Sequence, residues 1–303
     1  MKIVLPQHLL IASLLVSIAF AETDNAPPPP PEKSILRSGK AVLPLDSDAA
    51  RPTIQAKING KGPFLFVLDT GAQGFVIHAD LAKELGLPIV GKDTMGDPSD
   101  PDAIEVDQVR IESVDIGPIS LSGVTAISWD QPPAMKAHLK GRGIFGVSML
   151  SAFLVTFDYP GSKIVVENGS LSAHGSDNVV EWRAKDDGLP TLEITVADVT
   201  FDAHIDSGSP SKLTLPENMK TKLSFVDEPV VVGHGRTVNS EFKVWRGTID
   251  GVMKLGTLVV KNPDVSLVSM LDSTGYANIG TAFLRDFVIT FDQTNGLIRF
   301  KKG

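Results

Sequence analysis

The same succession of landmarks occurs twice along this chain, and this internal repeat constrains the fold more than any single motif. The apolar run Phe64–Leu68 leads into Asp69-Thr70-Gly71-Ala72. A second run, ending in Ala203-His204-Ile205, leads into Asp206-Ser207-Gly208-Ser209. An Asp that follows directly on an apolar strand, in two equivalent frames, predicts two lobes of common fold.

Further landmarks follow each Asp-containing turn in the same order and at nearly constant spacing. They are a short helical stretch, a turn, a glycine directly after an apolar residue and a strand ending in Phe-Asp. The paired segments are Leu81 to Leu85 and Met219 to Leu223, Ile116-Gly117 and Leu255-Gly256, Ile144-Phe145-Gly146 and Asn278-Ile279-Gly280, and Val155–Asp158 and Ile289–Asp292. We therefore expect a first lobe over residues 48–170, a linker over 171–179 and a second lobe over 180–303.

Within each lobe the apolar segments are short and rich in β-branched and aromatic residues. Gly, Pro, Asn or Asp interrupts them at short and regular intervals, which is typical of sandwiches and barrels rather than of βαβ units. The pattern predicts a mainly β fold with a few short helices.

Composition excludes several classes of function. The 303 residues contain 42% hydrophobic residues, enough to build two packed domains. There are 36 acidic against 28 basic residues, a formal net charge of −8, and no basic run, so a nucleic-acid partner is not expected. The absence of cysteine removes disulfide frameworks, thiolate metal sites and cysteine nucleophiles.

The N-terminal segment has the pattern of an export signal over residues 1–21. Lys2 precedes an apolar run from Leu9 to Phe20, and Ala19-Phe20-Ala21 has the small-x-small pattern of a cleavage site. A membrane anchor is the alternative, but the run is shorter than the about 20 residues that a spanning helix needs. We expect an exported protein, periplasmic or secreted, without stable membrane insertion once the signal is removed.

Residues 22–47 are expected to form a proline-rich disordered tether ahead of the first lobe. Pro27–Pro31 is an unbroken proline run, which favours an extended polyproline II segment and cannot enter a sheet.

The two Asp-containing motifs, each followed by an apolar-apolar-Gly element and a strand ending in Phe-Asp, resemble those of the aspartic peptidases, over nearly all of residues 48–303. Each half resembles a bacterial retropepsin-like lobe, while the joining of two lobes in one chain is similar to the pepsin arrangement. The resemblance implies an all-β fold of two duplicated closed barrels with a substrate cleft between them. It further implies Asp69 and Asp206 as catalytic residues, a peptide or protein substrate, no cofactor or metal, and a monomer.

The chemistry of the motif can be argued from the residues alone. A carboxylate at the end of a buried strand must be paired or functional, because its desolvation is costly. Gly71 and Gly208 allow a tight turn, and we expect the hydroxyls of Thr70 and Ser207 to tie each loop to the backbone of the other lobe. Two such loops that face each other would bring the two carboxylates within hydrogen-bond distance. Such a pair would share one proton and activate a water between them.

The two motifs also differ, and the sequence departs from pepsins. Ala72 follows the first motif whereas Ser209 follows the second, and we expect the Ser209 hydroxyl to contact the outer oxygen of Asp206. No tyrosine occupies the stretch where a pepsin flap carries one. The candidate flaps are residues 91–109 and residues 230–243. The first region is either a solvated surface loop or a loop over the cleft that favours basic side chains of a peptide. Its acidic residues are Asp93, Asp97, Asp100, Asp102, Glu105 and Asp107.

Three other interpretations remain open. The chain could be a two-lobed peptide-binding or scaffolding protein without turnover, a purely structural duplication, or a one-lobed enzyme that dimerises. Metal and serine-hydrolase chemistry find less support, since the six histidines are scattered and Gly146-Val147-Ser148-Met149-Leu150 lacks the second glycine of a nucleophile elbow. His204 is expected to be a supporting residue, and Trp129, Trp182 and Trp245 to be core residues.

Overall fold

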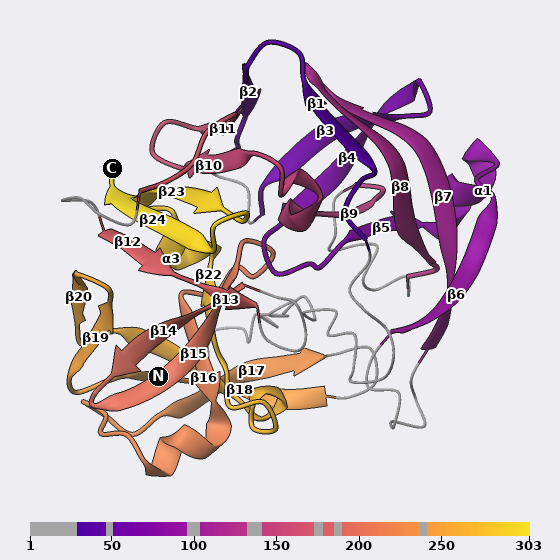
Figure 1. Cartoon of the computed structure of the whole chain (residues 1–303). Coiled ribbons are helices and arrows are strands. Elements are labelled where there is room, and N and C mark those ends of the chain that lie inside the picture. Colours follow the sequence, from indigo (N-terminus) through magenta and orange to yellow (C-terminus); the bar gives the residue numbers. More distant parts are fainter. Residues whose placement is uncertain are drawn as a thin grey trace, which may run out of the picture.

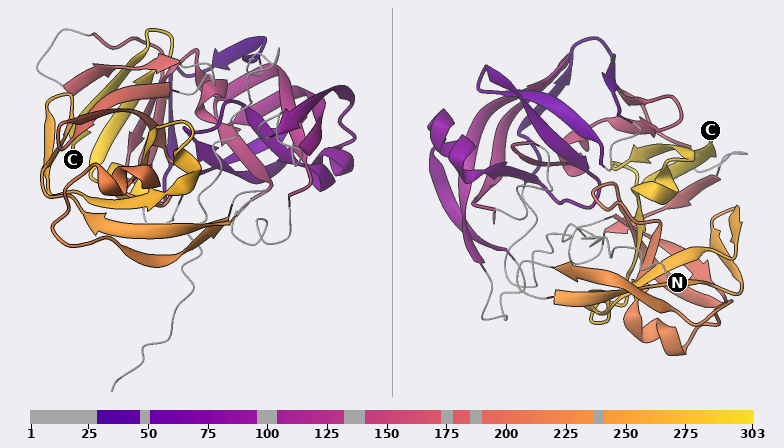
Figure 2. Two further views of the ribbon diagram at one scale, coloured as in Figure 1. Left: turned by 90° about the horizontal axis from the view of Figure 1, so that it is seen from below. Right: turned by 180° about the vertical axis from the view of Figure 1, so that it is seen from behind.

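The computed structural model describes residues 29–46, 51–95, 104–131, 141–172, 178–184, 190–236 and 241–303. The fold is mainly β, as the sequence predicts, and is divided among three sheets (Figure 1). Views from below and from behind show the indigo-to-magenta part and the orange part as two separate lobes (Figure 2).

The first lobe is a closed barrel with two additional edge strands. Its eight strands pair in the order β1-β8-β5-β9-β4-β3-β7-β6, and a further pairing of β7 with β8 closes the ring. The strands are β1 (Lys33–Leu36), β3 (Thr53–Ile58), β4 (Lys61–Asp69), β5 (Phe75–His78), β6 (Ile89–Met95), β7 (Ile104–Ile116), β8 (Ile119–Trp129) and β9 (Gly143–Gly146).

The second lobe repeats this plan as a half-barrel of ten strands. The path runs β17-β18-β21-β16-β22-β15-β14-β19-β20, with β13 paired to β14. The strands are β13 (Arg183–Ala184), β14 (Pro190–Val196), β15 (Val199–Asp206), β16 (Leu213–Pro216), β17 (Val230–Arg236), β18 (Glu241–Thr248), β19 (Val252–Leu255), β20 (Leu258–Lys261), β21 (Asp264–Val268) and β22 (Ala277–Gly280).

The lobes differ in their long hairpin. In the first lobe β7 and β8 run unbroken and pair from Asp107 with Ser128 to Ile116 with Ile119. In the second lobe the equivalent hairpin is split into β18 with β21 and β19 with β20. Gly251 and the dipeptide Asn262-Pro263 lie at the break, and a proline has no N–H to donate to a ladder. Duplicated barrel lobes are thus confirmed, with only the first one closed.

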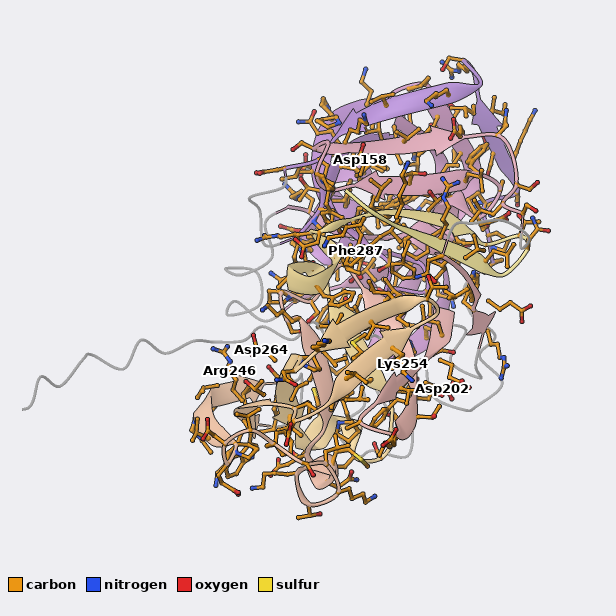
Figure 3. All side chains as sticks on the ribbon, turned by 90° about the vertical axis from the view of Figure 1, so that its left-hand side faces the viewer. Asp158, Asp202, Arg246, Lys254, Asp264 and Phe287 are labelled. Atoms are coloured by element: carbon orange, nitrogen blue, oxygen red, sulfur yellow. The ribbon has the colours of Figure 1, made fainter. Side chains whose placement is uncertain are left out.

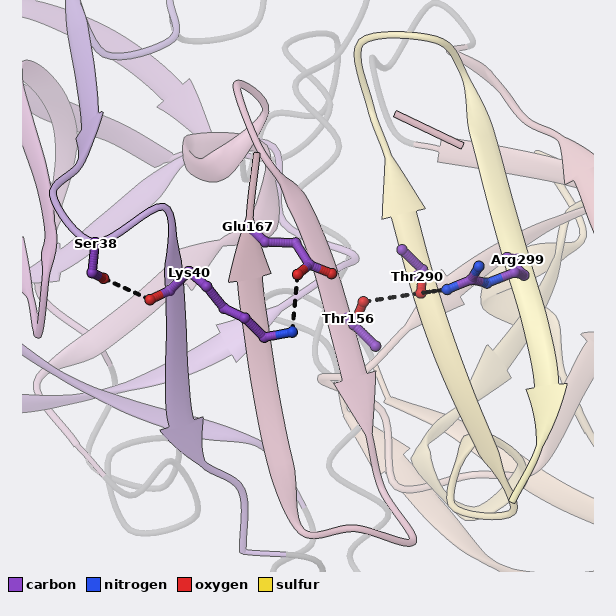
Figure 4. Close-up of polar contacts among 6 residues, drawn as sticks. All are labelled: Ser38, Lys40, Thr156, Glu167, Thr290 and Arg299. Atoms are coloured by element: carbon purple, nitrogen blue, oxygen red, sulfur yellow. Dashed lines mark hydrogen bonds and ion pairs between the residues drawn. The ribbon is translucent and has the colours of Figure 1, made fainter. Parts of the chain in front are cut away.

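A third sheet joins the lobes. Its order is β12-β24-β23-β10-β11-β2, and β10 from the first half pairs antiparallel with β23 from the second. Across this pairing Thr156 and Thr290 share a hydrogen bond of 2.9 Å, and Arg299 donates to Thr290 over 3.1 Å (Figure 4). The strands are β2 (Lys40–Pro44), β10 (Leu154–Asp158), β11 (Lys163–Glu167), β12 (Asn178–Glu181), β23 (Phe287–Asp292) and β24 (Leu297–Lys302).

The N-terminal tether needs a correction. Within residues 22–47, strand β1 pairs with β8, and β2 pairs with β11 on the edge of the joining sheet. An ion pair of 3.0 Å between Lys40 and Glu167 accompanies the β2–β11 pairing (Figure 4). The tether interpretation is therefore wrong for residues 33–44. It extended the character of the proline run to the residues that follow it, and these form two short strands. The expected linker, 171–179, likewise overlaps β12.

The helices are short and the core is continuous between lobes. The predicted helix before Gly86 is α1, whereas the stretch after Pro216 is a single 3-10 turn. The main hydrophobic cluster includes fully buried Phe145 and Phe157 from the first half and Phe291 from the second. Among the described residues no helix is long and apolar enough to cross a membrane. The helical segments are α1 (Ala79–Leu85), η1 (Val147–Leu150), η2 (Glu217–Thr221), η3 (Ser269–Leu271) and α3 (Thr281–Leu284).

Candidate active site

Each candidate catalytic Asp is the last residue of a buried strand. Strand β4 ends at Asp69 and runs parallel to β9, where Gly146 lies opposite Asp69. Strand β15 ends at Asp206 and runs parallel to β22, with Gly280 opposite. A Cβ added at Gly146 would lie 2.4 Å from a backbone oxygen, and one at Gly280 would lie 2.5 Å from another. Glycine is needed at both places because backbone approaches closely on each side.

The two Asp-containing loops bind each other across the lobe junction. The Thr70 hydroxyl donates to the carbonyl of Ile205 over 2.6 Å, and the Ser207 hydroxyl donates to the carbonyl of Leu68 over 2.9 Å. In return, the backbone N–H of Thr70 donates to the Ser207 oxygen and that of Ser207 to the Thr70 oxygen. The predicted tie between the lobes is confirmed, and it is reciprocal.

This arrangement brings the two carboxylates together in a buried place. Asp69 and Asp206 are 4% and 2% exposed. A Cβ added at Gly71 would lie 3.1 Å from Oδ1 of Asp206 and 3.3 Å from Oδ1 of Asp69, so a single atom there would touch both groups. The backbone N–H of Gly208 donates to Oδ1 of Asp69 over 3.2 Å, from one lobe to the other.

The donors around the two carboxylates are not the same. Asp69 accepts from the backbone N–H of Gly71 over 2.8 Å as well as from Gly208. Asp206 accepts from the backbone N–H of Ser209 over 2.9 Å and from the side-chain amide of Asn278 over 2.7 Å. The second carboxylate therefore has a side-chain donor in addition to its backbone contacts.

Burial sets the protonation of this pair. Desolvation, together with the nearby charge of Asp206, raises the pKa of Asp69 to about 8. Desolvation also raises the pKa of Asp206, opposed by hydrogen bonds from Asn278, Ser209 and Gly208. Because the charge of Asp206 is one of the causes that raise the pKa of Asp69, the two carboxyls titrate as a pair, and ionisation of the one makes ionisation of the other harder.

Arg51 also lies at the candidate site, although sequence reasoning missed it. It lies ahead of the first apolar strand of its lobe and outside both repeated motifs, so nothing in the local pattern linked it to the site. Its Nε donates to the carbonyl of Gly208 over 2.6 Å, from the first lobe to the loop of the second. Arg51 is 9% exposed, and its charge lowers the pKa of both Asp69 and Asp206.

The expectation for Ser209 was wrong in its detail. Its hydroxyl shares a hydrogen bond of 2.8 Å with Ser211, and its backbone N–H, not its side chain, contacts Asp206. The side-chain amide of Asn278 donates to Oδ2 of Asp206 instead. The departure of Asn-Ile-Gly from the apolar-apolar-Gly pattern was the only signal that could have identified it. Ala72, at the equivalent place in the first lobe, packs in a small apolar cluster with Val67 and Ile144.

Within the candidate flap regions, residues 96–103 and 237–240 lie outside the described residues. Strand β6 pairs with β7, and β17 with β18. Lys92 forms ion pairs with Glu105 and Asp107, and Asp93 accepts from Gln108, so much of the described acidity here is internally paired. Asp97, Asp100 and Asp102 are not described.

The remaining candidates are structural. Trp129 is buried, whereas Trp182 and Trp245 are partly buried and pack against the main core. His204 is buried and contacts the ring of Tyr276 edge-on, with centroids 4.7 Å apart. Figure 3 labels four charged residues of the second lobe, of which Arg246, Lys254 and Asp264 are exposed and Asp202 is half-buried. Over the described ranges, no three His, Asp or Glu side chains gather as a metal site requires.

Comparison with known proteins finds a family similarity in the first lobe, around Asp69. Residues 54–149, which include Asp69 and most of the first barrel, match the aspartyl protease family model. A search of curated proteins found no match to this chain. The matched region covers less than half of the chain and contains the strands of the first barrel and the Asp-Thr-Gly-Ala loop, so this part of the chain is similar to the aspartyl protease family.

Proposed function

We propose that this protein is an aspartic endopeptidase that hydrolyses peptide bonds with a water held between Asp69 and Asp206. The observation that carries the proposal is the reciprocal tie between the two loops, which holds two buried carboxyls from different lobes against each other. A fold that served only as a scaffold would gain nothing from burying two like charges, because their desolvation and repulsion destabilise it.

The mechanism uses the proton that the pair shares. The ionised carboxylate accepts a proton from water as the water attacks the scissile carbonyl, and the protonated partner donates to the carbonyl oxygen. When the tetrahedral intermediate collapses and the C–N bond breaks, the carboxyl that took a proton from water gives it to the leaving amine nitrogen, and the other carboxylate takes back a proton from a hydroxyl of the intermediate, so that the dyad again holds one proton. No covalent intermediate with the enzyme forms, and no metal is required.

The deciding experiment is a peptide-library digest with purified protein across pH 3 to 8. Wild type should cleave, and a transition-state analogue should inhibit it. Asp69→Asn and Asp206→Asn should each lower kcat by about 10²–10⁴-fold or more, since each removes one proton-transfer role. Asp264→Asn, an exposed acid on the second lobe, is the matched control and should leave kcat unchanged. Substantial turnover by either dyad variant would refute the mechanism.

The main rival is a two-lobed peptide-binding protein without turnover. Such a protein would bind peptides or the transition-state analogue in a titration and yet release every peptide intact at every pH. The same digest therefore separates the two functions.

We further propose that one chain forms the complete active unit. Because both Asp motifs are in one chain, the tethered lobes have an effective concentration on the order of millimolar. Specific activity should then be independent of enzyme concentration. A specific activity that falls with dilution, together with a dimeric mass at high concentration, would place the cleft between chains instead.

Export is proposed from the N-terminal pattern alone. Cleavage after Ala21 would give a mature protein that begins at Glu22 and lies in the periplasm or outside the cell. N-terminal sequencing of protein recovered from the exported fraction tests this, and recovery of Met1 would contradict it.

A further inference from the structure

Asn278 stands at a place where the two lobes, otherwise alike, carry opposite chemistry. On β22 it lies beside His204 of β15 and Thr214 of β16. Its counterpart in the first lobe is Ile144 on β9, which lies beside Val67 of β4 and Val76 of β5. The first lobe has three aliphatic side chains where the second has three polar ones.

A buried carboxamide at this place needs a compensating interaction. Asn278 is 4% exposed, and an amide without hydrogen bonds is costly to bury. Its Nδ2 donates to Oδ2 of Asp206 over 2.7 Å, while its Oδ1 has no hydrogen-bond partner in the described part of the chain. The contact with Asp206 is therefore the one that offsets the burial of this side chain.

The contact changes the balance of donors around the dyad. Backbone N–H groups of Ser209 and Gly208 stabilise the ionised form of Asp206, and those of Gly71 and Gly208 stabilise that of Asp69. The amide of Asn278 is a third donor to Asp206, without an equivalent at Asp69. A carboxylate that accepts more hydrogen bonds gives up its proton more readily.

We infer that Asn278 is a positioning residue that makes the dyad unsymmetrical, holding Asp206 as the ionised member and leaving the shared proton on Asp69. The inference rests on the proposed peptidase function and assigns the roles within it. Asp206 is then the base toward water, and Asp69 is the acid toward the scissile carbonyl.

Other titratable groups face the same place and must be followed in any titration. The charge of Arg51 lowers the pKa of both carboxylates. The buried hydroxyl of Tyr159 is close enough to interact electrostatically with Asp69, Asp206 and Arg285. His204 lies beside Asn278 and contacts Tyr276. Of these, His204 has the ordinary pKa closest to the working range, so its ring signals need to be recorded separately.

The test replaces the donor while keeping the volume. Asn278→Leu removes both polar atoms, and Asn278→Asp keeps the shape but can donate only while protonated. Residue-specific ¹³Cγ shifts of aspartate, recorded on the full chain, would give the macroscopic pKa values of the dyad, with signals assigned through Asp69→Asn and Asp206→Asn. Ile144→Leu, which changes no hydrogen bond, is the matched control.

We expect the Asp206 signal to report the lower of the two pKa values in wild type. In Asn278→Leu that value should rise by about one to two pH units, which is the effect of losing a hydrogen bond to a charged group. In Asn278→Asp it should rise as well, whereas Ile144→Leu should leave it in place. Where wild type hydrolyses peptides, the acid limb of kcat/KM should move upward by the same amount, with KM little changed.

The titration needs no turnover, so it separates this inference from the proposed function. An inactive wild type with the expected pKa shift would refute the peptidase and retain the unsymmetrical dyad. Unchanged dyad pKa values in both folded variants would reduce Asn278 to a packing residue. If the pKa of Asp206 were lower in Asn278→Leu than in wild type, Oδ1 of Asn278 would accept a hydrogen bond from a protonated Asp206. Asp206 would then be the protonated member of the dyad and Asp69 the ionised one.

Discussion

The two lobes present the same loop in different surroundings. Asp69 and Asp206 both end a buried strand, face a glycine on a parallel strand and are tied by a hydroxyl to the opposite lobe. Around Asp69 the neighbouring strands contribute aliphatic side chains such as Ile144, whereas around Asp206 they contribute Asn278 and a chain of hydroxyls. The backbone scaffold is duplicated, but the polarity around it is not.

A buried cation adds to this difference. Arg51-Pro52 precedes the first strand pair of the first lobe, and the equivalent dipeptide of the second lobe is Leu189-Pro190. Arg51 reaches across to the loop of the second lobe at Gly208. A dyad built from equal halves would have equivalent carboxylates, so the unequal neighbours are what can assign them separate roles.

The largest expected effect comes from adding one carbon to each loop glycine. A Cβ at Gly208 would lie 2.4 Å from Oδ2 of Asp69, whereas a Cβ at Gly71 would lie 3.1 Å from Asp206. Gly208→Ala should therefore displace Asp69, abolish turnover and cost about 1–3 kcal/mol of stability. Gly71→Ala should be milder in both assays. Equal losses in kcat and in chemical denaturation would contradict the difference between the loops.

Next in size is the pH dependence of stability. The folded pKa of Asp69, about 8, lies above the ordinary value of 3.8, so the folded state binds the extra proton between these values. Stability should be full below pH 4 and should fall as the pH rises toward 8, by a few kcal/mol at most. Asp69→Asn should reduce this slope, leaving the part that comes from the raised pKa of Asp206, and should be more stable than wild type near pH 8. Urea unfolding at pH 4 and pH 8 measures it, and parallel slopes would exclude the raised pKa.

Removal of the hydroxyl tie should act equally from either side. Thr70→Val and Ser207→Ala each leave a buried carbonyl and a buried N–H without their partner, at a cost of about 1–3 kcal/mol. Because the two contacts are reciprocal, the double variant should cost less than the sum of the single ones. Additive losses in a double-mutant cycle would show that the two hydroxyls act independently.

The smallest effect is expected at Arg51. Arg51→Met keeps much of the side-chain volume but removes the contact with Gly208 and the cation that lowers the pKa of both carboxylates. Both dyad pKa values should rise, and stability should change by about 1 kcal/mol because a buried charge is also removed. Aspartate ¹³Cγ titration checks this, and unchanged values would show that the guanidinium only joins the lobes.

Much of the site was predictable because its parts are local in sequence. The strand, the Asp, the hydroxyl and the glycine are consecutive in each lobe, and the repeat showed that they come as a pair. Thr70 and Ser207 could be assigned a role because the loop geometry leaves a hydroxyl beside a backbone carbonyl. Arg51 and Asn278 could not, since their distance to the dyad depends on how strands β14, β15 and β22 and the lobe junction are packed.

The failures at the N-terminus have a related cause. Residues 33–44 alternate weakly, and strands as short as β1 and β2 have no stability of their own. They are strands because β8 and β11 present free edges to them. The pattern of apolar residues in the sequence also does not distinguish the continuous β7–β8 hairpin from its broken counterpart near Pro263.

The sequence by itself determined the duplication, the mainly β class and the two Asp-containing loops, since each depends on residues that are neighbours along the chain. Tertiary structure decided which edges β1 and β2 complete, how the joining sheet mixes strands of both halves, and which side chains reach the dyad. The charge around Asp69 and Asp206 comes from contacts that are local in sequence, such as that of Gly71, and from contacts as distant as that of Arg51 with Gly208. Only the packing of strands from both halves brings the distant residues within hydrogen-bond distance, so the folded chain is needed to show which donors make one carboxylate differ from the other.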